Sequence, residues 1–316
     1  MSFFGGGSDY RRYYERFGGQ VLTSTIDRYC YISARRMPPF LGTKYRIVWS
    51  TFEKVDLVKD IQHAGVRGVL QYLGVEDGIE VNHAGDLPAR SGLGSSSAFT
   101  VGMLHAMHAL AGERPGRATL ANEAIAVEQD VLKETVGIQD QIECAWGGVN
   151  VIGFGRDGRY SVEPLVLTNG RRKEIEDHLV LVFTDVQRHA SEIAAAQVDN
   201  VDRKLGELHR IVELVSPAAE AMSAGDMAEF GALLHESWLL KRGLSDKVSN
   251  PALDAIYERG RAAGAYGGKV LGAGGGGFML FCVPPDRRQA VIDATGLLSV
   301  PVRFEQGGSQ LILAET

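Results

Sequence analysis

The chain has 316 residues, of which 45% are hydrophobic and 23% charged, and its formal net charge is −6. This composition is typical of globular proteins and excludes collagen, coiled coils and largely disordered chains. The chain lacks the basic footprint that nucleic acids and anionic membranes require, so we expect neither as a partner. No apolar run reaches the roughly 20 residues that a bilayer needs, and we expect no membrane span.

The three cysteines lie far apart and form no Cys-x-x-Cys pair, which favours a reducing compartment and predicts a cytoplasmic protein. Domains usually hold roughly 100 to 200 residues, so two are expected. We place the boundary in the polar stretch 169–173, which gives domains 1–172 and 173–316. Glycine is the anomaly, because 39 of 316 residues are glycine, about 12% against a usual share of about 7%.

The first predicted domain combines strands and helices. Runs of β-branched and aromatic residues predict strands at 20–26, 29–34 and 45–50. Apolar residues at three- and four-residue spacing predict helices at 57–73, 96–111 and 118–134. Short strands separated by glycine turns return over 147–166.

The second predicted domain begins with a continuously apolar run at 179–184, as expected of a strand buried on both faces. Apolar spacing then predicts helices at 205–215, 227–240 and 251–263, the first of them ended by Pro217. The remaining chain predicts a strand, a helix and two strands, at 278–283, 287–295, 300–304 and 310–314.

A loop rich in glycine and serine runs directly into the predicted helix at 96: Pro-Ala-Arg-Ser-Gly-Leu-Gly-Ser-Ser-Ser-Ala, residues 88–98. A glycine turn at a helix start presents unpaired N–H groups and the positive end of the helix dipole to an anion. The spacing fits neither a Walker loop nor a dinucleotide fingerprint. The alternative is an ordinary turn with a serine N-cap.

A second glycine-rich loop, residues 267–277, precedes the predicted strand at 278: Gly-Gly-Lys-Val-Leu-Gly-Ala-Gly-Gly-Gly-Gly. Four consecutive glycines cost backbone entropy and provide no side-chain packing, so another group must approach the backbone closely. That group is a ligand or, alternatively, another stretch of backbone from across a domain boundary.

Two further segments carry acidic residues beside glycines. Asp140, in Gly-Ile-Gln-Asp-Gln at 137–141, is expected in a short loop, where it could accept a proton from a hydroxyl, and Glu128 could hold Mg²⁺. Asp9 follows Phe-Phe-Gly-Gly-Gly-Ser at 3–8. Most aspartates in loops form turns or caps, and a strand followed by such a turn is the alternative for the first segment.

Taken in this order, the segments resemble the GHMP kinase superfamily, named for galactokinase, homoserine kinase, mevalonate kinase and phosphomevalonate kinase. The segments 4–10, 88–98 and 269–278 are similar to its first, second and third motifs. Within this superfamily, the sequence most resembles kinases that act on D-glycero-D-manno-heptose 7-phosphate. The segments behind that choice are Ser-Phe-Phe-Gly-Gly-Gly-Ser-Asp at 2–9, Thr-Ser-Thr-Ile-Asp at 23–27, Gly-Ile-Gln-Asp-Gln at 137–141, Trp-Gly-Gly-Val-Asn at 146–150 and His-Glu-Ser-Trp-x-x-Lys-Arg at 235–242.

The resemblance implies an α/β plus α+β fold, with an N-terminal α/β domain containing a left-handed βαβ unit and a C-terminal ferredoxin-like domain. It implies transfer of the γ-phosphoryl group of ATP, with Mg²⁺, to the anomeric hydroxyl of heptose 7-phosphate. The product would be the 1,7-bisphosphate, a precursor of nucleotide-activated heptose for surface polysaccharide. The expected partners are ATP and a sugar phosphate, with a homodimer as a candidate assembly.

The resemblance also assigns residues, each at the position that matches a family motif. Asp140 would be the catalytic base, and Ser96 and Glu128 would hold Mg²⁺. The residues assigned to ATP are Gly92, Leu93, Gly94, Ser95, Ser96 and Ser97. The residues assigned to the substrate are Gly6, Gly7, Asp9, Gly275, Gly276 and, for the 7-phosphate, Arg188.

The sequence departs from the family pattern at two places. Galactokinases carry Glu-His before the sugar-binding aspartate, where this chain has Gly6 and Gly7, so galactose is disfavoured. An arginine that assists phosphoryl transfer in relatives would fall immediately before Met1, and Arg11 or Lys269 could replace it.

The 7-phosphate requires a second anion site, and guanidinium groups suit phosphate. Arg188 is preferred because it follows the buried strand 179–184. The other candidates are Arg11, Arg12, Lys241 and Arg242.

Two alternative functions stay open on sequence grounds. The first is another GHMP sugar kinase, acting on L-fucose or on unphosphorylated heptose. The second is a non-catalytic homologue that binds sugar or ATP without transferring phosphate.

Overall fold

The structure, a computed structural model, describes residues 1–88, 91–186 and 190–313. The chain forms two compact units that are interleaved in sequence. In the described ranges, the first unit holds residues 1–27, 91–93 and 148–306, and the second holds 28–88, 94–147 and 307–313. The predicted cut after residue 172 coincides with no boundary between these units, since it falls in helix α6 (Asn169–His178) of the first.

The first unit contains a sheet built from both ends of the predicted N-terminal domain. Its strands run antiparallel in the order β1-β2-β7-β8, with bounds Ser2–Phe4, Gly19–Ser24, Val149–Phe154 and Tyr160–Pro164. Phe3 and Phe4 of β1 are fully buried, and their rings pack edge-on against Phe230 at 5.7 and 5.3 Å between centroids. This packing joins β1 to the helices of the same unit.

A second sheet in the first unit confirms the predicted ferredoxin-like architecture. Its strands run antiparallel in the order β10-β11-β9-β12, with bounds Gly267–Val270, Phe278–Cys282, Leu179–Phe183 and Ser299–Val300. Helices separate β9 from β10, and α12 (Arg288–Thr295) separates β11 from β12. The chain order is therefore β-α-β-β-α-β with inserted helices.

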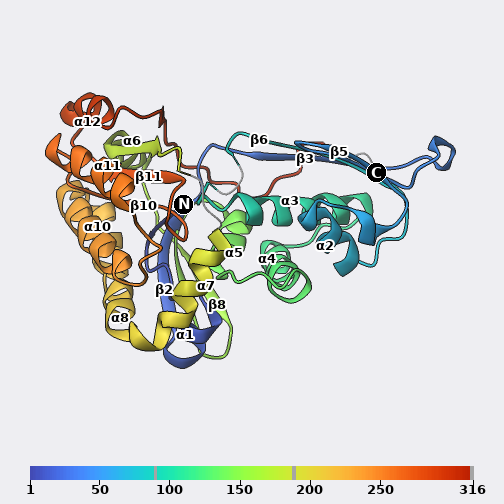
Figure 1. The fold of residues 1–316 in the computed structure, drawn as a ribbon, viewed down its shortest axis with the longest axis horizontal. Helices are drawn as coiled ribbons and strands as arrows, with labels where there is room; N and C mark the ends of the chain where they lie inside the picture. Colours follow the sequence, from blue (N-terminus) through green and yellow to red (C-terminus); the bar gives the residue numbers. More distant parts are fainter. Residues whose placement is uncertain (89–90, 187–189, 314–316) are drawn as a thin grey trace. The chain divides into compact units, whose positions relative to one another are not determined.

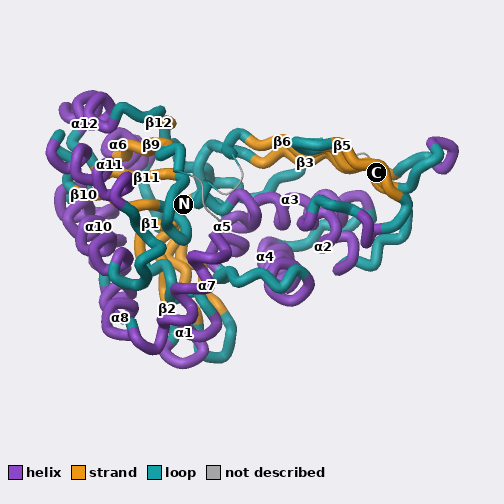
Figure 2. Tube along the Cα trace, viewed as in Figure 1, coloured by secondary structure: helices purple, strands orange, loops and turns teal. Residues whose placement is uncertain are grey.

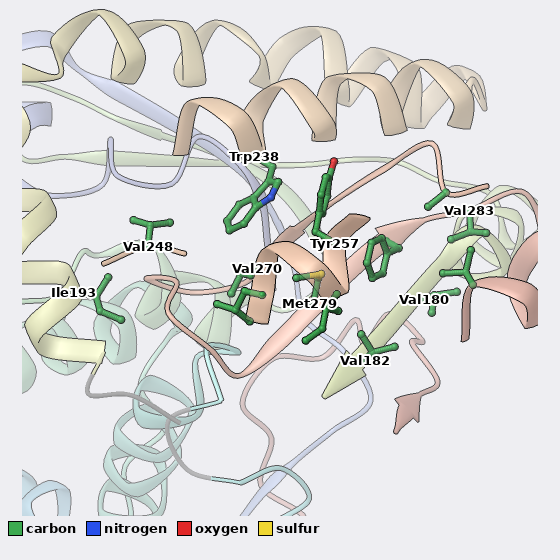
Figure 3. Close-up of a cluster of buried hydrophobic side chains, with 14 residues drawn as sticks. Val180, Val182, Ile193, Trp238, Val248, Tyr257, Val270, Met279 and Val283 are labelled. Carbon is green, nitrogen blue, oxygen red and sulfur yellow. The ribbon is translucent and has the colours of Figure 1, made fainter. Parts of the chain in front are cut away.

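Some helices of the first unit pack on this second sheet, and others pack on β2 of the first sheet. In the described residues the helices of this unit are α1 (Arg11–Phe17), α6, α7 (Ala190–Asn200), α8 (Leu205–Glu213), α9 (Val215–Ala224), α10 (Met227–Arg242), α11 (Pro251–Ala262) and α12 (Figure 2). Figure 3 shows the core between them, where Trp238 of α10 and Tyr257 of α11 lie over Val180, Val270 and Met279. Continuous apolar sequence in β9 and β11 matches burial on both faces.

The second unit is built on a mixed sheet, β3-β6-β4-β5, with bounds Cys30–Arg36, Ile79–Gly85, Tyr45–Val48 and Phe52–Val55. Strands β4 and β6 are parallel, so the chain must cross over between them, and α2 (Ala64–Tyr72) lies in that connection. Helix α3 (Ser95–Leu110) runs along one face of the sheet (Figure 1). Helices α4 (Arg117–Ala126) and α5 (Gln139–Trp146) complete the unit.

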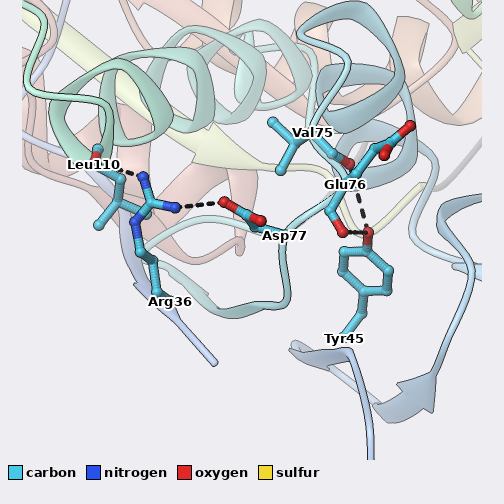
Figure 4. Close-up of polar contacts among 6 residues, drawn as sticks. All are labelled: Arg36, Tyr45, Val75, Glu76, Asp77 and Leu110. Atoms are coloured by element: carbon cyan, nitrogen blue, oxygen red, sulfur yellow. Dashed lines mark hydrogen bonds and ion pairs between the residues drawn. The ribbon is translucent and has the colours of Figure 1, made fainter. Parts of the chain in front are cut away.

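Polar contacts fasten the ends of β3 and β4 to the turn that follows α2 (Figure 4). Arg36 forms an ion pair with Asp77 at 2.6 Å and donates to the carbonyl of Leu110 at 3.3 Å. The Tyr45 hydroxyl donates to the carbonyl of Glu76 at 3.2 Å. These contacts fix one end of α3 against the sheet.

The helix predicted at 57–73 begins only at Ala64, and β5 before it was not predicted. The cause is Glu53 on β5, whose carboxylate accepts from the backbone N–H of Gln62 at 2.5 Å and of His63 at 3.1 Å. His63 then caps α2 by accepting from the N–H of Val66. A helix across this segment would lose these bonds.

Three other boundaries differ from the predictions. Pro217 ends no helix: it lies in the first turn of α9, where a missing N–H costs nothing. The helix predicted at 118–134 breaks at Ala126 into a π-helical turn, η3 (Val127–Val131). Of the two last strands, only β12 and an isolated bridge at Phe304 form, and 310–313 contains no strand.

Over the described ranges, no helix combines the length and the apolar character needed to cross a membrane.

Candidate active site

The glycine-serine loop ends at the start of helix α3, as predicted. Gly94 occupies the N-cap position in the left-handed conformation (φ 74°, ψ 21°), and among the described residues no side-chain hydrogen bond caps the helix. Its carbonyl accepts from the N–H of Ala98 at 2.8 Å, so the N–H groups of residues 95–97 have no acceptor within the helix. The serine N-cap alternative is therefore wrong, and the helix start has the form of an anion site.

The earlier part of this loop packs against the third motif, within the first unit. A Cβ atom on Gly92 would lie 2.8 Å from the carbonyl oxygen of Leu271, and one on Gly272 would lie 2.6 Å from the Cα of Gly92. The N–H of Phe278 donates to the carbonyl of Ser91 at 3.3 Å. The two glycine-rich loops thus meet backbone to backbone.

The run of glycines at 274–277 is needed because neighbouring backbone lies too close for side chains. A Cβ atom would lie 2.8 Å from the Val248 carbonyl oxygen at Gly274, 2.0 Å from that of Val186 at Gly276, and 2.3 Å from that of Ser91 at Gly277. These carbonyls belong to the same compact unit as the loop. Close backbone contact, the alternative to ligand approach, accounts for these three glycines without an inter-unit contact.

One predicted substrate contact is not available in this conformation. The N–H of Gly275 donates to the carbonyl of Val248 at 2.7 Å, so this amide already has an acceptor. The assignment of Gly276 to the substrate stays a prediction.

Glu128 lies in the π-helical turn η3, and its side chain is 1% exposed. Its Oε2 atom accepts from Gln141 Nε2 at 2.5 Å and from Ser97 Oγ at 3.1 Å. Ser96, the predicted partner in metal binding, is exposed. The structure therefore brings Ser97, rather than Ser96, to Glu128.

The surroundings of Glu128 suit a hard cation. Burial raises its pKa to about 7, and the hydrogen bonds from Gln141 and Ser97 oppose this rise. Its Oε1 atom and the Oε1 atom of Gln141 are buried and have no hydrogen-bond partner in the described part of the chain. Buried oxygen acceptors without donors are the ligands that Mg²⁺ prefers, so the residues present fit this ion.

Asp140 lies in the first turn of helix α5, and not in the short loop that we expected. Its carboxyl carbon is 3.4 Å from the position of a Cβ atom on Gly94, so the loop glycine lies directly against the carboxyl group. Burial raises the pKa of Asp140 above its usual value. The structure thus joins the predicted catalytic aspartate to the start of α3 within the second unit.

The first motif forms strand β1 followed by a tight turn. Asp9 is 2% exposed, and its Oδ1 accepts from the N–H of Gly7 at 3.0 Å. A Cβ atom on Gly5, which has a positive φ, would lie 2.0 Å from the carbonyl oxygen of Gln20. The strand-and-turn alternative describes this backbone correctly, while the role of Gly6, Gly7 and Asp9 in sugar binding stays a prediction.

Arg188, predicted to bind the second phosphate, lies outside the described residues. The other candidate cations each have partners. Arg11 pairs with Glu15 at 3.8 Å, Arg12 with Asp202 at 2.6 Å and Arg242 with Asp254 at 3.2 Å. Lys241 donates to carbonyls of the third motif.

Lys269, considered above as a replacement for the family arginine, donates to the carbonyl of Phe3 at 2.7 Å. Its ammonium group is therefore buried between the first and third motifs, within the first unit.

Comparison with known proteins assigns this arrangement to a family. The model of the GHMP kinases N-terminal domain matches residues 57–148, and that of the GHMP kinases C-terminal region matches 218–295. The chain belongs to the GHMP kinase family. The first match contains the glycine- and serine-rich loop at 88–98, which we call the anion loop, together with Glu128 and Asp140. The second match contains the third motif. The chain is therefore a phosphotransferase.

Individual relatives narrow the comparison. A D-glycero-alpha-D-manno-heptose 7-phosphate kinase of Campylobacter jejuni is 31% identical over 96% of this chain and 91% of its own length. The crystal structure of a D-glycero-D-manno-heptose 1-phosphate kinase from Bacteroides thetaiotaomicron aligns with a TM-score of 0.80 and 25% identity over 98% of this chain and 94% of that one. These relatives support a sugar kinase.

A galactokinase of Lactococcus lactis shares the fold, with a TM-score of 0.75 and 20% identity over 99% of this chain and 92% of that one.

Sequence reasoning missed two contacts at this site. The sequence predicted no binding role for Gln141, and it assigned Ser97 to ATP alone. A polar residue directly beside the catalytic aspartate was the available signal for Gln141. For Ser97 there was none, since the choice between adjacent serines depends on how α3 faces η3.

Proposed function

We propose that this protein transfers the γ-phosphoryl group of ATP to the anomeric hydroxyl of D-glycero-D-manno-heptose 7-phosphate, giving the 1,7-bisphosphate and ADP. The observation that carries the proposal is the Asp140 carboxyl group lying against Gly94 at the uncapped start of α3. A relative named for this substrate, 31% identical over 96% of the chain, supports the choice of sugar. The product would serve nucleotide-activated heptose for surface polysaccharide.

Phosphoryl transfer is mainly a matter of positioning and charge stabilisation, and it needs no covalent nucleophile. In the proposed reaction the anomeric oxygen forms a bond to the γ-phosphorus, and the bond to the oxygen bridging the β- and γ-phosphates breaks. ADP leaves with that oxygen. Asp140 orients the anomeric hydroxyl and accepts its proton, and burial raises the pKa of Asp140 toward a value useful to a base.

The phosphates would lie at the N–H groups of the loop that begins at Gly92, with Leu93, Gly94 and Ser95 following. Glu128 would hold Mg²⁺ through its unpartnered Oε1 atom, with Ser96 as the second proposed ligand. Bound Mg²⁺ neutralises charge on the ATP phosphates. Ser97 and Gln141 would orient the Glu128 carboxylate through their bonds to Oε2.

The sugar would be held by the first motif. Asp9 offers a carboxylate for sugar hydroxyls, and the absence of side chains at Gly6 and Gly7 leaves room that galactokinases fill with Glu-His. The 7-phosphate is assigned to Arg188, since guanidinium groups match phosphate geometry. Gly276 is assigned to the substrate side of the third motif.

An assay of ADP release tests the proposal. Wild-type protein and Asp140→Asn should be given heptose 7-phosphate, heptose 1-phosphate, free heptose, L-fucose and galactose, each with MgATP. We expect turnover with heptose 7-phosphate and product phosphorylated at C1 by ³¹P NMR. Turnover only with another sugar would identify that sugar as the substrate. Ligand binding without turnover of any sugar would support a non-catalytic homologue.

A further inference from the structure

Two lysines are buried behind the third motif, in the first unit. Lys241 of α10 is 9% exposed, and its Nζ donates to the carbonyls of Val270 at 3.0 Å and Gly272 at 2.5 Å. Lys269 of β10 is 3% exposed, and its Nζ donates to the carbonyl of Phe3 at 2.7 Å. Across the described ranges, neither ammonium group has a carboxylate partner.

Burying an ammonium group is costly unless an anion compensates its charge. The pKa values express this cost: burial lowers that of Lys241 to about 8 and that of Lys269 well below its usual value. The charge of Lys241 depresses the pKa of Lys269 further, so the two lysines repel each other. In their protonated forms the two neighbouring lysines have only carbonyl partners in the described residues, and a nearby anion would favour those forms.

The contacts of these donors also set the direction of the loop amides. Lys241 takes the carbonyl of Gly272, and Gln197 of α7 donates through Nε2 to the carbonyl of Ala273 at 2.7 Å. In a trans peptide the N–H points opposite to the C=O, and no described peptide bond is cis. The N–H groups of Ala273 and Gly274 therefore point away from the two buried donors.

These two amides are open to a ligand. No hydrogen-bond acceptor is recorded for either in the parts of the chain described, and Ala273 and Gly274 are half-buried beside the exposed Gly272. Gly272 and Gly274 both have positive φ, 63° and 104°. Successive N–H groups around left-handed residues form concave sites for anions. The loop thus combines amides that point away from the buried donors with two buried lysines that have no carboxylate partner in the described residues.

We propose that Lys241 and Gln197 are positioning residues that hold residues 272–274 as a binding site for a phosphoryl group, whose charge compensates the two buried ammonium groups. The proposal rests on the proposed function only in taking that group from ATP or from the sugar phosphate. The site lies beside the anion loop, because Gly272 contacts Gly92. It moves the ligand-binding amides of the third motif from Gly275 to Ala273 and Gly274.

Three variants and a control test the proposal. Lys241→Met keeps most of the side-chain volume without charge or donors, Lys241→Arg keeps the charge, and Gln197→Leu removes the second carbonyl donor. Lys173→Met is the control, because Lys173 is 73% exposed and pairs only with Asp177 in the described residues. Each is titrated by calorimetry with a magnesium complex of a non-hydrolysable ATP analogue, with heptose 7-phosphate and with free heptose.

We expect Lys241→Met to weaken binding of one phosphorylated ligand about tenfold or more, the loss expected for a charged hydrogen-bonding group. Free heptose should be unaffected, and KM for that ligand should rise while kcat at saturation stays within about threefold. Lys241→Arg should restore part of the affinity. Gln197→Leu should show a smaller loss for the same ligand.

Amide NMR signals of Ala273 and Gly274 provide a readout that a purely structural role would not move. They should shift when the bound phosphoryl ligand is added and not with free heptose. A shift with the ATP analogue assigns the site to the nucleotide, and a shift with heptose 7-phosphate assigns it to the sugar phosphate.

Unmoved amides with both ligands, or a folded Lys241→Met with wild-type affinity for both, would overturn the proposal. Should Lys241→Met not fold, Gln197→Leu and the wild-type amide signals decide. A wild-type protein that shows the amide shift with the ATP analogue but no turnover of heptose 7-phosphate would refute the proposed function and leave this site standing. Turnover of heptose 7-phosphate with unshifted amide signals would support the proposed function and refute this site.

Discussion

The two glycine-rich loops use the same residue for different purposes. At the start of α3, Gly94 lets the chain turn into the helix, and the N–H groups of residues 95–97 have no acceptor within that helix. In the third motif, Gly276 and Gly277 are needed because the carbonyls of Val186 and Ser91 lie where side chains would be. A glycine-rich sequence therefore indicates close approach to the backbone, but it does not tell whether a ligand or another strand of chain approaches.

The largest expected effect is on kcat, and it comes from Asp140, whose carboxyl group lies against Gly94 of the anion loop. Asp140→Asn should lower kcat by about a hundredfold or more, the usual contribution of a general base, while KM for the sugar stays within about threefold. Steady-state ADP release gives both constants. A kcat within about threefold of wild type would remove Asp140 as the base.

The pH profile of the same pair of proteins gives an independent check. Burial raises the pKa of Asp140, and the base must be deprotonated to act, so wild-type kcat should fall as pH drops toward that raised pKa. The acid limb should therefore lie above the usual pKa of an aspartate. The residual activity of Asp140→Asn should lack this limb.

The next effect contrasts the two loops through matched glycine substitutions. Gly277→Ala places a Cβ 2.3 Å from the Ser91 carbonyl oxygen at φ +84°, and Gly94→Ala places one 3.4 Å from the Asp140 carboxyl carbon at φ +74°. We expect Gly277→Ala to lower the free energy of unfolding by about 3 kcal/mol or more, and Gly94→Ala by about 1 kcal/mol. Denaturant unfolding measures both.

For activity we expect the opposite order: in folded protein, Gly94→Ala should lower kcat more than Gly277→Ala does. Gly94→Ala crowds the proposed base and should lower kcat about tenfold, since small misplacements at a reacting centre are costly. Equal losses of stability in the two variants would contradict the contrast between Gly94, which faces the proposed ligand, and Gly277, which packs against backbone.

A third effect concerns the carboxylate beside the anion loop. Glu128→Gln removes the negative charge while keeping the shape, so we expect the Mg²⁺ concentration for half-maximal activity to rise about tenfold. Electron paramagnetic resonance of bound Mn²⁺ gives a readout independent of turnover. Unchanged Mn²⁺ affinity would place the metal elsewhere.

Sequence patterns predicted the motifs and most elements, because periodicity and turn residues are local signals. The buried run at 179–184 became β9, whereas β10 was not predicted because its two glycines indicated a loop. The helix start at Ala64 was not predictable, since it depends on Glu53 accepting from backbone ten residues later. Local sequence also could not show that the N–H of Gly275 donates to the carbonyl of Val248.

The same limit applies to the cluster around Glu128. Ser97 and Gln141 lie 31 and 13 residues away from it in sequence, and tertiary packing brings both to Glu128 in the π-helical turn η3. The family resemblance assigned Glu128 and Ser96 to the metal, whereas in the structure it is Ser97 that donates to Glu128. The choice between Ser96 and Ser97 is therefore open to a direct test.

The smallest expected effect separates these two adjacent serines. Ser97→Ala removes one of two donors to Glu128 Oε2 and leaves the other, from Gln141, in place. We expect a modest rise, about threefold, in the Mg²⁺ concentration for half-maximal activity, because a single neutral hydrogen bond contributes about 1 kcal/mol. Ser96 is exposed and makes no contact with Glu128 in the structure, so Ser96→Ala should have an effect only through a bound metal. Mn²⁺ affinity of the two variants distinguishes the roles: a loss in Ser96→Ala that exceeds the loss in Ser97→Ala makes Ser96 the ligand and Ser97 its support. The opposite order moves the proposed ligand to Ser97.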